Sequence, residues 1–176
     1  MQARKTAVAA VVAMMAFACV SEAQDKPGWL RRAFCHLTWQ ETIAVVETPK
    51  EICSAVRHNV SYLEDMGDEQ QSGLETWEKG TGDCEDFAAA VVDLSKRKGF
   101  EAAMYVFRIK ESGIAHAVAV GRHDGKMWLS SNGWYRQIDS WDNAREFVAR
   151  EMGWRSRQII VEAMHPQDEA SMVARN

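Results

Sequence analysis

Cys84, His116 and Asn132 are the side chains of this 176-residue chain whose types and order could perform covalent chemistry. Cys84 stands where the glycine-containing loop Gly80-Thr81-Gly82 meets an apolar stretch. A thiol at a helix start meets unpaired N–H groups and a partial positive charge, and both favour its thiolate. A cysteine followed by a histidine and then by a polar amide is the order expected of a thiol enzyme that transfers acyl groups.

The elements expected around these residues bring them together. The sequence predicts a helix over 83–98 that begins directly before Cys84, because Asp83 can cap it and Gly99 can end it. His116 falls in a predicted strand over 114–121. Asn132 follows the next predicted strand, where it could hydrogen-bond the far ring nitrogen of His116. Neighbouring antiparallel strands bring such residues close despite their separation in sequence.

The remaining pattern is that of an α+β domain in which helices precede an antiparallel sheet. Thr48, Pro49 and Glu51 make the start of an earlier helix, as N-cap, first helical residue and capping-box partner. The period then changes from that of helices to that of strands after Gly99. The further expected elements are strands over 102–109, 126–131, 135–139 and 158–162, and a helix over 142–152.

Acidic side chains beside the thiol act against its ionisation. Asp83 and Glu85 flank Cys84 in the sequence, and a nearby carboxylate raises the pKa of a thiol. Asp83 as N-cap with Asp86 three residues later forms a capping box, which is a sufficient structural role for both. Glu85 would then project sideways or bind a cation.

The run from Trp77 to Ala88, Trp-Glu-Lys-Gly-Thr-Gly-Asp-Cys-Glu-Asp-Phe-Ala, closely resembles the nucleophile motif of bacterial transglutaminase-like cysteine peptidases. These belong to the wider transglutaminase-like, papain-related superfamily. The resemblance covers about 48–139. It implies a papain/transglutaminase-like α+β core in which N-terminal helices, including the nucleophile helix, pack on an antiparallel sheet.

The resemblance also implies roles for individual residues. Cys84 would be the nucleophile and His116 the general base and acid. The third position is usually Asp in this family, whereas this chain has Asn132, and asparagine does the same orienting work in papain-like enzymes. Asp139 is the fallback for that position. Some periplasmic members bind calcium through the acids that flank the cysteine.

Two cation sites can be judged from the sequence. By the resemblance, a calcium ion would be held by Asp83 and Glu85, and no other cofactor is required. The histidines show no metal-ligand spacing such as His-x-x-x-His, so we predict no zinc site.

The ends of the chain predict export. Residues 1–23 have a basic start, an apolar run too short to span a bilayer and small residues before a cleavage point, as in a signal peptide. Cleavage before Cys19 and lipidation of that cysteine is the alternative. We expect a lead-in over 24–47, the transglutaminase-like domain over 48–165 and a tail over 166–176, with no transmembrane segment in the mature chain.

Three cysteines remain after removal of the signal peptide, so at least one thiol is unpaired within the chain. The economical assignment is a disulfide between Cys35 and Cys53 that leaves Cys84 free. The alternative is that Cys35 and Cys53 are buried, unpaired thiols. Sequence gives no distances with which to choose between them.

The expected function is that of an exported, periplasmic or extracellular thiol enzyme that cleaves or transfers at amide bonds through a Cys84 thioester. A cysteine peptidase or amidase acting on a protein or peptide is favoured over a transglutaminase. The alternative is an inactive domain of the same fold that binds peptides in the cell envelope. The net charge of −4 and the scattered basic residues argue against a nucleic-acid partner.

Overall fold

A computed structural model describes residues 36–64, 71–110 and 112–163 of the chain. The chain divides into two compact units, Met1–Val45 and Val46–Asn176. The described part of the first unit contains helix α3 (Trp39–Val45). Its start is held locally, because the Glu41 carboxylate accepts hydrogen bonds from the N–H and the hydroxyl of Thr38. The second unit contains all three residues expected to do chemistry.

The helices of the second unit that precede the sheet each begin with a capping box. The side chain of Thr48, Ser72 or Asp83 accepts a hydrogen bond from the third helical N–H, and the carboxylate at that third position accepts one from the N–H of the cap residue. Such reciprocal bonds satisfy donors that a helix start otherwise leaves unpaired. The three helices are α4 (Pro49–Asn59), α5 (Gly73–Lys79) and α6 (Cys84–Arg97).

Five antiparallel strands form the main sheet, in the order β6-β5-β4-β3-β7. The first four in sequence make a meander, and β7 returns to pair with β3 at the other edge. A separate parallel pair joins β1 (Ser61–Tyr62) to β2 (Thr81–Gly82) just before the cysteine. The strands of the main sheet are β3 (Glu101–Ile109), β4 (Ala115–His123), β5 (Lys126–Ser131), β6 (Trp134–Ile138) and β7 (Ile159–Ala163).

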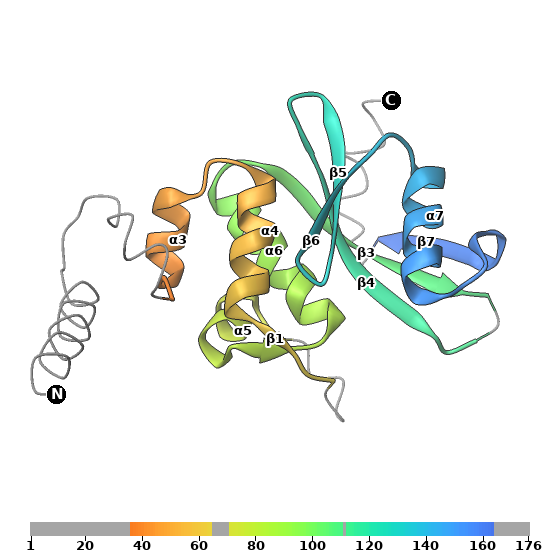
Figure 1. The fold of residues 1–176 in the computed structure, drawn as a ribbon, viewed down its shortest axis with the longest axis horizontal. Helices are drawn as coiled ribbons and strands as arrows, with labels where there is room; N and C mark the ends of the chain where they lie inside the picture. Colours follow the sequence, from red (N-terminus) through yellow and green to blue (C-terminus); the bar gives the residue numbers. More distant parts are fainter. Residues whose placement is uncertain (1–35, 65–70, 111, 164–176) are drawn as a thin grey trace, which may run out of the picture. The chain divides into compact units, whose positions relative to one another are not determined.

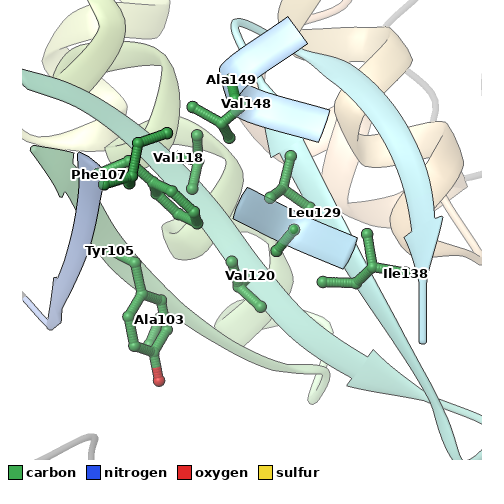
Figure 2. Packing of buried hydrophobic residues seen from close by; sticks show 11 residues of the cluster. Ala103, Tyr105, Phe107, Val118, Val120, Leu129, Ile138, Val148 and Ala149 are labelled. Atoms are coloured by element: carbon green, nitrogen blue, oxygen red, sulfur yellow. The ribbon is translucent and has the colours of Figure 1, made fainter. Parts of the chain in front are cut away.

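Helices cover both faces of this sheet. Helix α6 contacts β3, β4 and β5, and α4 contacts α6 and β6. Helix α7 (Trp141–Met152) lies on the opposite side of the sheet from α4 and α6, and the 3-10 helix η1 (Ser156–Gln158) follows it (Figure 1). A buried cluster fills the space between α7 and the sheet; Figure 2 shows its members Val118, Val120, Leu129, Ile138 and Val148.

The expected α+β architecture with the nucleophile helix on an antiparallel sheet is confirmed. The helix starts at Thr48 and Asp83 are those expected from their capping boxes, and β5 has the predicted bounds. Helix α5 was missed, because its seven residues carry only a short apolar pattern. No helix in the described part of the chain is long and apolar enough to cross a membrane.

Candidate active site

Cys84 is the first residue of α6, and its thiol lies against β4. The Ala117 N–H donates to Cys84 Sγ at 3.5 Å. The ladder between β4 and β5 begins at the Ala119–Ser130 pair, so Ala117 lies beyond the end of β5. The thiol therefore occupies the edge of β4 that the neighbouring strand leaves open. This contact brings residues 33 positions apart in the sequence together.

His116 adjoins Ala117 on β4 and is 3% exposed. Side chains alternate along a strand, so His116 points to the same face as Val118, which packs in the cluster under α7. There the His116 Nε2 atom lies 2.8 Å from the Oγ atom of Ser131, the last residue of β5. Ser131 is fully buried. Among the described residues, the site thus contains a thiol, an imidazole beside it in the sheet, and a serine behind the imidazole.

Ser131 makes the hydrogen bond to the far ring nitrogen that we expected from Asn132. Asn132 has a positive φ of 45° and Gly133 one of 76°, so the two form the tight turn between β5 and β6. The Oδ1 atom of Asn132 is buried and has no hydrogen-bond partner. Asp139, the fallback, is exposed just after β6. In this structure neither residue occupies the position beside His116 Nε2.

One sequence signal could have identified Ser131. Asn-Gly is the strongest short signal for a two-residue hairpin turn, since both residues tolerate positive φ. Assigning Asn132 and Gly133 to a turn makes Ser131 the last residue whose side chain stands on the strand face. The alternation of β5 then places Ser131 on the same face as Leu129, toward α7.

A carboxylate from α7 lies behind Ser131. Glu151, in the last turn of α7, is hydrogen-bonded to the Ser131 side chain. Burial raises the pKa of Glu151, while that bond and the Arg136 charge act to lower it. The residue lines a groove of about 770 Å³ between β6 and α7, which also includes Trp134 and Arg136. Sequence reasoning had no means of finding Glu151, because α7 meets the sheet only through tertiary packing.

The electrostatics of the site favour a neutral resting pair. Burial raises the pKa of the Cys84 thiol; the Ala117 N–H opposes this, and the charges of Asp83 and Glu85 reinforce it. Burial lowers the pKa of His116 to about 4, although the Asp83 charge acts to raise it. We expected a helix start to make the thiol acidic. That expectation was wrong, because desolvation and the flanking acids outweigh the favourable contacts.

The acids near Cys84 are used in the structure of the helix start. The Asp83 Oδ1 atom accepts from the N–H groups of Glu85 and Asp86. The Asp86 carboxylate, 1% exposed, accepts from the Gln71 backbone and side-chain N–H groups and from the Asp83 N–H. Within 36–64, 71–110 and 112–163, no group of three or more His, Cys, Asp or Glu side chains could hold a metal ion. The described residues alone therefore do not fit a calcium site, which needs six to eight oxygen ligands.

Cys53, on α4, is fully buried, and no disulfide joins it to Cys84, the other cysteine among the described residues. Burial raises the pKa of the Cys53 side chain to about 12. Such a thiol is inert rather than nucleophilic. Cys35, its expected partner, lies outside the described residues, as do Cys19 and the predicted signal peptide, so the disulfide stays a prediction.

Two exposed aromatic side chains flank the site. Tyr62 on β1 is 55% exposed, and its partner in register on β2 is Gly82, two residues before Cys84. Burial and the nearby Cys84 raise its pKa. Trp134, 57% exposed, follows the turn after Ser131 and carries the Arg57 guanidinium 4.0 Å from its ring centroid. Tyr62 thus leaves apolar surface open near the thiol, and Trp134 does so at the strand position paired with Ser131.

The sequence profile of the transglutaminase-like superfamily matches residues 37–137, more than half of the chain. The chain belongs to the transglutaminase-like superfamily. The matched segment includes the cysteine, the histidine, Ser131 and Asn132, whereas Asp139 and Glu151 lie beyond it. The resemblance drawn from the nucleophile motif is thereby confirmed at the level of family and fold.

Solved structures of two bacterial proteins align with part of the chain. LapG from Legionella pneumophila is 18% identical, with 51% of this chain aligned to 55% of that one at a TM-score of 0.42. The structure of its calcium-bound form is 18% identical, with 51% of this chain aligned to 56% of that one at a TM-score of 0.42. A putative cysteine protease from Cytophaga hutchinsonii is 14% identical, with 73% of this chain aligned to 46% of that one at a TM-score of 0.45. The aligned part spans about half the length of each. No curated protein matches the chain.

Proposed function

We propose that the protein is an exported thiol enzyme, most simply a cysteine peptidase or amidase, that opens amide bonds through a Cys84 thioester. The observation that carries the proposal is the contact between Cys84 Sγ and the Ala117 N–H, the residue next to His116. It supports the proposal because the thiol contacts the β4 backbone at the residue next to His116, in a chain of the transglutaminase-like superfamily. Cys84 is also partly exposed, so a substrate carbonyl could reach it.

The proposed reaction begins with the neutral pair. As Cys84 Sγ attacks the amide carbon, His116 accepts the thiol proton, so the sulfur never carries a long-lived charge beside Asp83 and Glu85. His116 then gives the proton to the departing amine, and an acyl thioester remains on Cys84. Water, deprotonated by His116, cleaves the thioester and regenerates the thiol with release of a carboxylic acid.

The helix start would supply a donor for the oxyanion. The Asp83 side chain takes the N–H groups of Glu85 and Asp86. The Cys84 N–H lies next to its own thiol, with which it is hydrogen-bonded. We assign to it stabilisation of the oxyanion that forms on the carbonyl oxygen during attack.

The proposal is tested by alkylating the purified mature protein with iodoacetamide between pH 5 and 10. If His116 is the base, Cys84 in the wild type should react at pH 7 at least roughly tenfold faster than in His116→Ala, since a positioned base contributes that order or more. At pH 10 the two proteins should converge, because the thiolate then forms without help. Cys84→Ala identifies labelling at other cysteines. Superimposable profiles for wild type and His116→Ala would contradict the proposal.

The alternative is an inactive domain that binds envelope peptides in the same cleft. The serine in place of a carboxylate beside His116 favours it, as does the neutral resting pair. The same alkylation profiles decide between the two proposals. Peptide binding that survives Cys84→Ala, combined with reactivity indifferent to His116, would establish the binding function.

Water or an amine could accept the acyl group, and both outcomes begin with the same thioester. We favour water, hence hydrolysis. Incubation with a glutamine-containing protein and a fluorescent primary amine separates them by mass spectrometry: hydrolysis yields shorter peptides or deamidated side chains, whereas transfer yields amine adducts. The exposed rings of Tyr62 and Trp134 would border the bound peptide.

Export of the protein and binding of calcium are two further proposals, each with its own test. Detection of the mature chain starting near residue 24 in the periplasm or medium would support export, whereas a retained N-terminus would contradict it. Calcium at Asp83 and Glu85 would require further ligands from outside the described residues. A thermal midpoint unchanged between calcium and a chelator would argue against that site.

A further inference from the structure

We propose that Glu151 sets the protonation of the His116 ring through the Ser131 hydroxyl, and so replaces the acid that the family usually places directly beside the histidine. This role rests on the proposed function of His116 as the base. The three groups come from three elements: His116 from β4, Ser131 from the end of β5 and Glu151 from the last turn of α7. Glu151 acts through another residue and is therefore a positioning residue.

The direction of the two hydrogen bonds follows from proton counting. A serine hydroxyl has one proton to donate, and an ionised carboxylate can only accept. In the bond between Ser131 and Glu151 the hydroxyl must therefore be the donor. Its oxygen is then the acceptor in the 2.8 Å contact with His116 Nε2, which must carry a proton. A neutral His116 thus keeps its proton on Nε2 and leaves Nδ1 unprotonated.

An unprotonated Nδ1 is the state that a general base requires. The ring can then accept the Cys84 proton at Nδ1, and the resulting imidazolium donates through Nε2 to Ser131 while Ser131 continues to donate to Glu151. No proton leaves His116 toward Ser131 or Glu151 in this step. If Glu151 were protonated or absent, the hydroxyl could turn and donate to Nε2. That arrangement would favour the proton on Nδ1 and block the transfer.

The surroundings of the relay support a carboxylate rather than a carboxylic acid. Ser131 is fully buried, whereas Glu151 borders the groove between β6 and α7, where solvent reaches it. Burial raises the pKa of Glu151, whereas the Ser131 hydroxyl and the charge of Arg136 on β6 favour its ionised form, and Arg150 lines the same groove. Asp83, the N-cap of α6, acts on His116 through its charge, and Cys84 contacts the N–H of the neighbouring Ala117.

The tautomer can be measured without any substrate. In protein labelled with ¹⁵N-histidine, long-range ¹H–¹⁵N correlation spectra at pH 7 distinguish the two neutral tautomers, and the His116→Gln spectrum assigns the signal among the five histidines of the chain. We expect the Nε2–H tautomer in the wild type and a shift toward Nδ1–H in Glu151→Ala. The matched control Glu146→Ala removes an exposed acid from the same helix and should change nothing. A wild-type Nδ1–H tautomer, or a Glu151→Ala spectrum like the wild type, would overturn the proposal.

A rescue experiment ties the tautomer to reactivity. Glu151→Ala should slow alkylation of Cys84 at pH 7 by roughly tenfold, the lower range of a positioned base's contribution. In a Ser131→Asp background the new carboxylate can hydrogen-bond His116 Nε2 directly. Adding Glu151→Ala to that background should therefore leave the rate of Cys84 alkylation unchanged. An equal loss in both backgrounds would show that Glu151 only supports the fold. Reactivity indifferent to His116→Ala would instead defeat the proposed function while leaving the tautomer result standing.

Discussion

At the scale of the residue, two opposed pKa shifts define the site. Burial raises the pKa of Cys84 and lowers that of His116, so proton transfer between them is unfavourable in the resting protein. An enzyme with a preformed thiolate–imidazolium pair would need both shifts reversed. In the proposed reaction the proton therefore moves during attack, when the carbonyl begins to take up the negative charge. This requirement makes the orientation of His116 more important here than the acidity of the thiol.

The flanking acids provide a prediction about that thiol. Glu85→Gln should lower the pKa of Cys84, because it removes a negative charge that opposes ionisation. Iodoacetamide labelling at pH 8 should become severalfold faster. Asp83→Asn, whose amide oxygen can still cap α6, should act in the same direction on Cys84 but also lower the pKa of His116 further. Slower labelling in Glu85→Gln would contradict the assigned electrostatics.

A second prediction separates Ser131 from Asn132. Ser131→Ala should reduce alkylation of Cys84 at pH 7, since it removes the acceptor of His116 Nε2. Asn132→Gly should leave it unchanged, because Gly accepts the positive φ of this turn and the Asn132 Oδ1 atom has no hydrogen-bond partner. Equilibrium unfolding should show stability within about 1 kcal/mol of the wild type for Asn132→Gly. A loss of reactivity in Asn132→Gly alone would restore Asn132 as the third residue.

For the helices and strands, signals within a few residues were sufficient to predict where helices begin. Contacts that depend on strand register or on the packing of distant elements could not be predicted from such signals. The caps at Thr48 and Asp83 depend on residues within one helical turn, so the sequence predicts them. The contact between Cys84 and Ala117 could be expected from the order of helix and strands. Whether Ser131 or Asn132 faces His116 depends on where β5 ends, and a difference of one residue changes the answer. The Glu151 contact depends on how α7 packs, which no local pattern encodes.

The start of α6 gives a stability prediction. The buried Asp86 carboxylate joins three donors, two from Gln71 and one from Asp83. Asp86→Ala would leave them without this acceptor and should cost about 3 kcal/mol in the free energy of unfolding. Glu75→Ala removes the equivalent acid from the exposed capping box of α5 and should lower the free energy of unfolding by much less, because solvent can replace the lost acceptor. Urea unfolding measures both, and equal losses would show that burial adds nothing to the Asp86 interactions.

At the scale of the whole molecule, the site is built into the core rather than placed on a surface loop. His116 continues the β4 row that includes Val118 and Val120, and Ser131 continues the β5 row that includes Leu129. The packing under α7 that stabilises the fold therefore also holds the imidazole and its serine partner. A protonated imidazole at this position would place a charge among buried apolar side chains. Folding and acid–base chemistry are consequently linked through His116.

That linkage predicts how stability changes with pH. The unfolded chain binds a proton at His116 below about pH 6.5, whereas the folded protein does so only below about 4. Stability from this residue is therefore complete above 6.5 and is lost as pH falls toward 4, by about 3 kcal/mol in total. Between pH 7 and 4.5 the wild type should lose about 2–3 kcal/mol more than His116→Gln in urea unfolding. Parallel losses in wild type and His116→Gln would mean that His116 is not held neutral by burial.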